Sequence, residues 1–183
     1  AQGKVYRDLG EPNKALECLD QALVISQDSA DIALEGTALN QRAGVNHNLG
    51  EYALALRDLT RSLELARLDQ DERRMANTLI NMGILSTKLA DYPRALAVFA
   101  EANKHISGLN DPKLEGECLV NLALLYEDMG DNYKALETCQ LALQTVSSLE
   151  NRFLEAITRV NLGFAHKRLG QDQAALKSFA AAM

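Results

Sequence analysis

Histidine and cysteine, two common catalytic side chains, occur only three times each in this chain and lie far apart in its sequence. The three histidines, His47, His105 and His166, do not have the spacing of metal ligands. The sequence also contains no glycine-rich phosphate loop and no nucleophile elbow. We therefore expect no catalytic residue, no metal site and no cofactor, and we predict that the chain is not an enzyme.

Amide side chains recur at regular intervals and could provide binding chemistry instead. Asn81, Asn121 and Asn161 are spaced 40 residues apart, and Gln41 stands one interval earlier. An amide both donates and accepts hydrogen bonds, so it can pair with the main chain of an extended peptide whatever the sequence of that peptide. We predict this role for the amides. The alternative is that they only hold one helix to its neighbour.

These amides belong to a longer pattern with the spacing i, i+4, i+7 and i+11, which places its members on one face of a helix. The pattern reads Thr37, Gln41, Gly44 and Asn48, then Asn77, Asn81, Ile84 and Lys88, then Glu117, Asn121, Leu124 and Asp128, then Ile157, Asn161, Phe164 and Arg168. We call these residues the amide stripe. Its apolar members Ile84, Leu124 and Phe164 provide a floor beside the amides. The predicted peptide-binding groove comprises the whole stripe except Thr37, Gly44 and Ile157.

A repeat of 40 residues carries this pattern along the chain. The phrase NLGEYALAL at 48–56 has near-copies at 8–16, 88–96, 128–136 and 168–176. One column of the repeat is always alanine and the next is always leucine, as in Ala95 and Leu96. The repeats give three full units, 31–70, 71–110 and 111–150, between incomplete units at 1–30 and 151–183. We therefore expect one array of repeats that spans 1–183.

Capping residues divide each unit into two helices. The units start with residues that cap helices at their amino ends, namely Asp31, Asp71, Asp111 and Asn151. The first helical pattern ends as at a carboxyl-terminal cap, at Gly50, Gly130 and Gly170, with Ala90 in one unit. A second apolar pattern follows, for example Ala95, Phe99, Ala102 and Ile106. Each unit is predicted to be a hairpin of a helix A and a helix B.

Small residues recur where the two helices of a hairpin should cross. One column reads Gly3, Ala43, Gly83, Ala123 and Gly163, and the alanine column that includes Ala95 is a second one. A minimal side chain lets two backbones approach closely, whereas a bulky one would overpack the crossing. We expect these columns to mark the contact between helix A and helix B.

At these residues the chain resembles the tetratricopeptide repeat family. The matching residues are Gly83, the pair Leu49 and Gly50, Ala95 and Phe99, and the match covers essentially the whole chain. The unit is longer than the usual ~34 residues, and is similar to the long-repeat branch that includes kinesin light chains, spindle-orientation adaptors and bacterial peptide sensors. The resemblance implies an all-α fold, a right-handed α-superhelix or solenoid of antiparallel helical hairpins. It also implies that helix A lines the concave face and that the matching asparagines contact the main chain of a bound peptide.

Two polar residues depart from the family pattern on one helix A. Arg42 and Asn46 stand where another unit has Leu122 and Tyr126. Side chains four residues apart on a helix are neighbours. We expect Arg42 and Asn46 to bond to each other, and a ligand-facing role is the alternative.

Composition and charge restrict the partners. A net charge of −6, spread over both signs, argues against nucleic acid, because phosphate binding needs a concentrated face of Lys and Arg. No apolar run approaches the ~18 residues of a membrane span, and the first residues carry no secretory signal. Cys18, Cys118 and Cys139 are odd in number and widely spaced, which is typical of buried apolar residues. We expect a cytoplasmic protein with protein or peptide partners that binds neither nucleic acid nor a membrane.

We interpret the array as a scaffold for protein–protein interaction that binds an extended peptide or partner segment in a concave groove. The chain opens and stops midway through expected helices, so we expect it to be a fragment of a larger adaptor or regulator. One alternative is a sensory module that binds a signal peptide or small ligand and controls an effector domain outside this segment. A second alternative is self-assembly, with a homodimer formed through exposed repeat ends.

Overall fold

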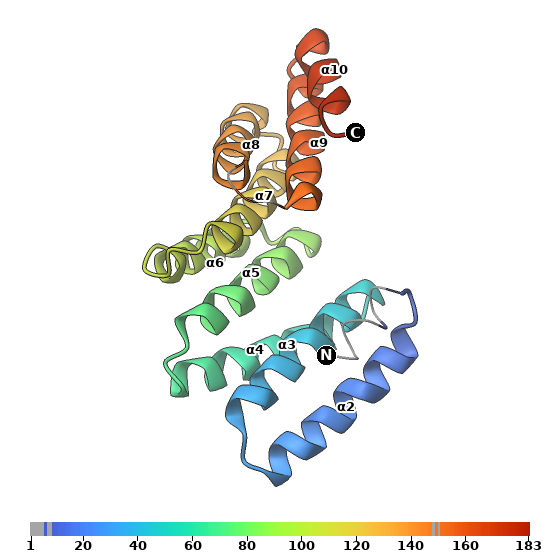
Figure 1. Cartoon of the computed structure of the whole chain (residues 1–183), viewed down its shortest axis with the longest axis vertical. Coiled ribbons are helices and arrows are strands. Elements are labelled where there is room, and N and C mark those ends of the chain that lie inside the picture. The colour runs from blue at the N-terminus through green and yellow to red at the C-terminus, as the bar shows by residue number, and fades with distance from the viewer. Residues whose placement is uncertain (1–5, 7–8, 148, 150) are drawn as a thin grey trace. The chain divides into compact units, whose positions relative to one another are not determined.

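The computed structural model describes residue 6 and residues 9–147, 149 and 151–183. In this part of the chain the regular structure is α-helical, without strands (Figure 1). The helices A are α3 (Ile32–Asn48), α5 (Glu72–Lys88), α7 (Pro112–Asp128) and α9 (Arg152–Arg168). The helices B are α2 (Pro12–Asp28), α4 (Tyr52–Leu68), α6 (Tyr92–Ile106), α8 (Asn132–Val146) and α10 (Asp172–Ala180). The predicted all-α fold is confirmed.

The chain divides into two compact units, Ala1–Leu85 and Ser86–Met183, and the division falls within α5. In the first unit, α2 packs on α3 and α3 packs on α4. In the second unit, each helix from α6 to α10 packs on the next, and α7 also contacts α9. Helices that follow one another in the chain are therefore neighbours within each unit, as in an array of helical hairpins (Figure 1).

The predicted capping residues start the helices A. The side chain of Asp31 accepts a hydrogen bond from the backbone N–H of Leu34 at 2.9 Å. The same bond, to the residue three positions later, is made by Asp71, Asp111 and Asn151. Each bond satisfies one of the backbone donors that a helix leaves unpaired at its amino end.

The helices A end at residues with a left-handed backbone. Gly50, Gly130 and Gly170 have φ angles of 79°, 78° and 72°, which glycine adopts without a steric penalty. Ala90 holds the same position after α5, with a φ of 56°, where a Cβ is less favourable. These residues stop helix A and let the chain reverse into helix B.

The small residues lie at close contacts. Ala15, Ala55, Ala95 and Ala135 are 0% exposed, and Ala175 is 3% exposed. In the α9–α10 hairpin, a Cβ added at Gly163 would overlap the ring of Phe179. This overlap explains why glycine stands there, since any side chain would displace the ring. Gly3, the first member of the small column, lies outside the described residues.

Two of the three cysteines are buried in the second unit. Cys118 is 3% exposed and Cys139 is 1% exposed. The loss of hydration raises the pKa of each thiol to about 12, so both are neutral at physiological pH. Cys18 is only half-buried, so the expectation of a buried apolar residue is incorrect there.

The bond predicted between Arg42 and Asn46 is wrong. Arg42 donates to both carboxylate oxygens of Asp58 on α4, at 2.7 and 2.9 Å, and to Asp20 on α2 at 2.7 Å. Asp58 is 1% exposed, and its hydrogen bond raises the pKa of Arg42 above its ordinary value. A guanidinium fits a carboxylate with two parallel bonds, which an amide on its own helix cannot offer. Asn46 is buried one turn further along α3.

Candidate functional site

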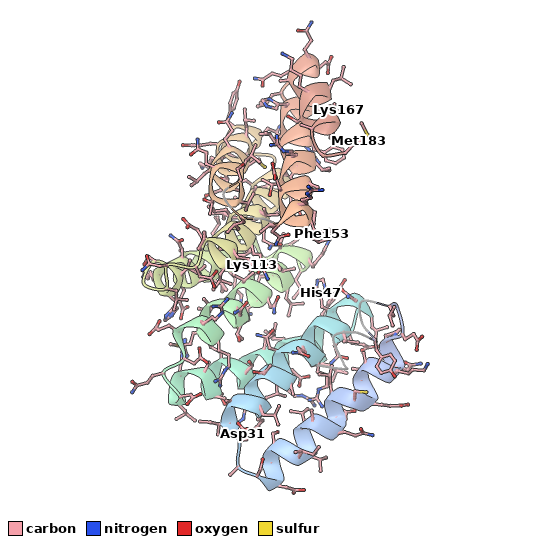
Figure 2. The ribbon with its side chains drawn as sticks, in the orientation of Figure 1. Asp31, His47, Lys113, Phe153, Lys167 and Met183 are labelled. Atoms are coloured by element: carbon pink, nitrogen blue, oxygen red, sulfur yellow. The ribbon has the colours of Figure 1, made fainter. Side chains whose placement is uncertain are left out.

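The amide stripe lies on the surfaces of the four helices A. Its members are exposed or half-buried, apart from Asn161, which is 8% exposed. The first unit carries the stripe residues of α3 and those of α5 up to Ile84, and the second unit carries Lys88 and the residues of α7 and α9. Figure 2 labels Asp31 and His47, which mark the two ends of the first stripe helix, α3.

A cavity of about 300 Å³ lies between α3 and α5 in the first unit. It is lined by Thr37, Asn40, Gln41, Asp71, Arg73, Arg74 and Asn77, and we call it the Arg73 cavity. Three of these residues, Thr37, Gln41 and Asn77, belong to the amide stripe. The walls therefore offer hydroxyl, amide and charged groups, which can pair with both the N–H and the C=O groups of a peptide main chain.

Hydrogen bonds and ion pairs hold one wall of the Arg73 cavity. Arg74 donates to Asp69 at 2.6 Å and to Asp71 at 2.9 Å. Asn77 Nδ2 donates to the carbonyl oxygen of Arg73 in the same helix at 3.0 Å. These bonds hold that wall of the cavity in one arrangement.

A second cavity, of about 260 Å³, lies between α3, α4 and α5. It is lined by Ala43, Gly44, His47, Asn48, Ala55, Leu59, Asn81, Ile84 and Leu85, and we call it the Gly44 cavity. Among these described residues there is no Asp, Glu, Lys or Arg. The stripe residues Gly44, Asn48, Asn81 and Ile84 form part of its lining, so this cavity combines apolar walls with two amides.

A buried polar network holds Asn81. Asn81 Nδ2 donates to Asn40 Oδ1 on α3 at 2.5 Å, and Asn40 Nδ2 donates to Thr78 Oγ1 at 2.7 Å. The Thr78 hydroxyl lies 3.2 Å from that of Ser62, which donates to the carbonyl oxygen of Gly36 at 2.8 Å. Asn81 thus ties α5 to α3, which is the alternative role considered for the amides, and it lines the Gly44 cavity as well.

The two stripe asparagines of the second unit have different surroundings. Asn121 is half-buried, and its Nδ2 donates to the carbonyl oxygen of Glu117 at 2.7 Å within α7. Asn161 Nδ2 is buried without a hydrogen-bond partner. Asn40, the partner of Asn81, lies in the unit before it, and the equivalent residue in the unit before Asn161 is Val120. The side chain of valine cannot accept a hydrogen bond. The asparagine column therefore has no single structural role.

Opposite charges meet between α7 and α9. A carboxylate oxygen of Glu127 lies 3.7 Å from the guanidinium of Arg168, and Glu127 is 8% exposed. Burial raises the pKa of Glu127 above its ordinary value, and the positive charge of Arg168 opposes this shift. Glu127 Oε1 is buried without a hydrogen-bond partner, so the charge is only partly compensated.

Several residues that line the cavities were not selected from the sequence. Asn40 could have been found, because the same repeat position is otherwise apolar, with Ile80, Val120 and Val160. Arg73 and Arg74 precede the stripe of α5, and a pattern on one helix does not show that they share a cavity with residues of α3. His47 was considered only as a metal ligand or catalytic residue, although it lines the Gly44 cavity.

Two other kinds of site are absent from the part of the chain that the structure describes. No group of three or more His, Cys, Asp or Glu side chains is placed there to hold a metal ion. The described helices also include none that is both long and apolar enough to cross a bilayer.

Helical hairpins that repeat every 40 residues and expose a recurrent polar face define a helical-repeat protein of the interaction-scaffold class. The sequence matches a family model of the tetratricopeptide repeat over residues 34–102 and 117–183, and a second model of this repeat over residues 1–29. These matches cover most of the chain, so it belongs to the tetratricopeptide repeat family. A comparison with curated proteins gave no match.

Solved structures from several sources share this fold. BtubC (BKLC) from P. vanneervenii has a TM-score of 0.81 at 20% identity, over 98% of this chain and 75% of that chain. A Rap protein complexed with Competence and Sporulation Factor has a TM-score of 0.91 at 13% identity, over 99% of this chain and 51% of that chain. A putative kinesin light chain from Podosopora anserina, with nearly identical repeats, has a TM-score of 0.73 at 14% identity, over 99% and 91% of the two chains. Likenesses at such identities show the fold alone.

Proposed function

We propose that this chain is a protein-interaction scaffold whose amide stripe binds an extended peptide or partner segment, and that it has no enzymatic activity. One observation carries the proposal. Every stripe residue of the first unit lines either the Arg73 cavity or the Gly44 cavity, both of which follow α3 and α5. The repeat pattern in the sequence and the hollows in the surface therefore coincide at these seven residues.

The chemistry of the first unit matches an extended main chain. Gln41 and Asn77 line the Arg73 cavity, and Asn48 and Asn81 line the Gly44 cavity. An extended peptide presents N–H and C=O groups along its length, and each amide can satisfy either kind of group. The Rap protein of the same fold was solved in complex with Competence and Sporulation Factor, which supports a binding role for this fold.

The second unit offers the same combination of amide and apolar groups. Asn121 is half-buried on α7, while Leu124 is 38% exposed and Phe164 is 47% exposed. Large apolar side chains in such an exposed position gain free energy when a partner covers them. We propose that these three residues contact the main chain and the apolar side chains of a bound segment.

The proposal can be tested with ligands selected from a peptide library against the whole chain. Gln41→Ala and Asn77→Ala should each weaken binding of a selected peptide by about 1–3 kcal/mol, because peptide groups would be buried without partners. Neither change should alter the free energy of unfolding by more than ~0.5 kcal/mol, since both side chains are only half-buried and Asn77 bonds within its own helix.

Asn13→Ala is the matched control, because Asn13 is an exposed asparagine on α2 outside the stripe. Calorimetric titration should show unchanged affinity for this variant. If Gln41→Ala and Asn77→Ala bind as tightly as Asn13→Ala does, the stripe is not the binding surface.

A further inference from the structure

The Gly44 cavity exists at a repeat position where the other units carry a large side chain. The column of Gly44 continues with Ile84, Leu124 and Phe164. Gly44 has no side chain to place in the cavity, and Leu59, Ala43 and Ala55 form apolar walls from α3 and α4. The hairpin α3–α4 therefore leaves open a space that the large side chain found at this repeat position in the other units would occupy.

The corresponding position in the α9–α10 hairpin shows what such a side chain does. Phe164 stands at the position of Gly44, and Phe179 stands at the position of Leu59. The two rings are 5.2 Å apart between centroids, with an interplanar angle of 71°. This edge-to-face arrangement is favourable for aromatic pairs. An aromatic ring is therefore accommodated at this place in the repeat.

We propose that the Gly44 cavity receives one aromatic side chain of the bound peptide. This inference rests on the proposed function and specifies the peptide: an extended segment with an uncharged aromatic residue at one position. The amides of Asn48 and Asn81 at the same cavity hold the main chain on either side of that residue. The peptide ring then supplies the side chain that Gly44 lacks.

Size and polarity favour this occupant over the alternatives. Pockets for drug-sized ligands have volumes of ~300–1,000 Å³, and the cavity of about 260 Å³ lies just below this range, which leaves enough room for a bulky side chain. A charged side chain would lose hydration there without an ion-pair partner in the lining. The imidazole of His47, whose centroid is 5.8 Å from that of the Tyr52 ring, provides an aromatic wall that an aliphatic side chain would use less well.

The first experiment uses a probe of defined structure and needs no selected peptide. N-acetyl-L-phenylalaninamide should shift the backbone amide resonances of Gly44, Leu59 and Ile84 in ¹⁵N spectra of the whole chain. N-acetyl-L-alaninamide at equal concentration should not. Gly44→Leu and Gly44→Phe, which copy Leu124 and Phe164, should abolish the shifts at Leu59 and Ile84, and Gly44→Ala should keep most of them.

Loss of folding is a separate outcome, and the set of variants distinguishes it from loss of the aromatic site. Glycine is the poorest helix former after proline, so Gly44→Leu should leave the melting temperature of the chain unchanged or raise it. If Gly44→Leu does not fold, Gly44→Ala and Gly44→Phe still give a graded series. Equal shifts from both probes, or shifts that survive in Gly44→Leu and Gly44→Phe, would overturn the inference.

The second experiment separates this inference from the proposed function. In a peptide selected from the library, replacement of one aromatic residue by alanine should weaken binding to the natural chain by about tenfold. The same replacement should have little effect on binding to Gly44→Leu. If Gln41→Ala and Asn77→Ala weaken binding but Gly44→Leu does not, the aromatic site is wrong while the stripe remains the binding surface. If none of the three changes affects binding, both proposals fail.

Discussion

The hairpins α3–α4 and α9–α10 have the same place in the repeat but differ in what fills the contact between their helices. At one pair of positions, α3–α4 has the buried ion pair of Arg42 and Asp58, whereas α9–α10 has Leu162 and Ser178. The ion pair has to recover the hydration that both charges lose, and this is possible only with good geometry. The α3–α4 hairpin therefore depends on one specific interaction where the α9–α10 hairpin depends on apolar contact.

A second pair of repeat positions also differs between the α3–α4 and α9–α10 hairpins. Phe164 and Phe179 pack against each other in α9–α10, whereas Gly44 and Leu59 line an open cavity in α3–α4. The repeat thus allows either two packed side chains or an open cavity at this pair of positions. Natural sequences depart from their own local rules mainly at functional sites, and for this reason we place the proposed aromatic site in the hairpin with the open space.

The largest effect should come from breaking the ion pair of the α3–α4 hairpin. Asp58→Ala leaves the guanidinium of Arg42 partly buried beside α4, with only the exposed Asp20 to compensate it. Removing one partner of a buried pair costs about 3–5 kcal/mol, and the bond to Asp20 places this case near the lower end. Urea denaturation followed by circular dichroism measures the change in the free energy of unfolding.

The matched control for Asp58→Ala is Ser178→Ala in the α9–α10 hairpin. Ser178 Oγ donates only to the carbonyl oxygen of Ala174 in its own helix, at 3.0 Å, so its loss should cost less than ~1 kcal/mol. The double change Arg42→Leu with Asp58→Ser copies the α9–α10 pair and should recover most of the lost stability. Equal losses for Asp58→Ala and Ser178→Ala would show that the two hairpins do not differ as proposed.

A smaller effect should come from adding a side chain at Gly163 in the α9–α10 hairpin. Gly163→Ala places a Cβ against the ring of Phe179, and such overpacking costs about 1–3 kcal/mol. Adding Phe179→Leu should relieve the overlap, because the pair then copies Ala43 and Leu59 of the α3–α4 hairpin. Thermal denaturation of the single and double variants checks both statements. If Phe179→Leu lowers the stability of Gly163→Ala further, the cost of the added Cβ does not come from overlap with the ring of Phe179.

The sequence predicts the helices and their ends well because these depend on local rules. The caps at Asp31 and Asn151 and the left-handed glycines act within one turn of the residue concerned. The small column is also predictable, because a crossing of two helices limits the size of its side chains in every repeat. The residue in the facing column varies with it, as in Gly163 with Phe179 but Ala43 with Leu59, and this pairing can be read from the sequence.

The polar contacts could not be predicted in the same way. The partners of Arg42 are on two other helices, and the spacing along α3 points to Asn46 instead. The environments of Asn81 and Asn161 differ because Asn40 accepts a bond from Asn81, whereas valine stands at the equivalent position before Asn161. A column of identical residues therefore indicates a shared face of a helix, but its bonds depend on the neighbouring helix.

The smallest expected effect concerns Glu127. It occupies in the second unit the repeat position that His47, which lines the Gly44 cavity, occupies in the first unit. Burial raises the pKa of Glu127 in the folded chain above its value in the unfolded chain, with Arg168 opposing the shift. A carboxyl with a raised pKa contributes stability below the ordinary glutamate pKa of ~4.3, and this contribution is lost as the pH rises through the raised value. Glu127→Gln removes the buried charge and keeps the shape of the side chain. We therefore expect the variant to be more stable than the natural chain at neutral pH, by less than ~1 kcal/mol because the attraction to Arg168 is lost.

Measurements of unfolding between about pH 4 and pH 8 can isolate this effect, with Glu137→Gln on the exposed surface of α8 as the control. The advantage of Glu127→Gln should shrink as the pH falls, because the natural side chain then binds a proton and also becomes neutral. Glu137→Gln should show no such pH dependence. A variant at position 127 that is less stable at neutral pH would mean that the ion pair with Arg168 outweighs the cost of burial. The second unit would then, like the α3–α4 hairpin, depend on a specific charge pair, and the contrast between the two regions would be limited to the aromatic contact.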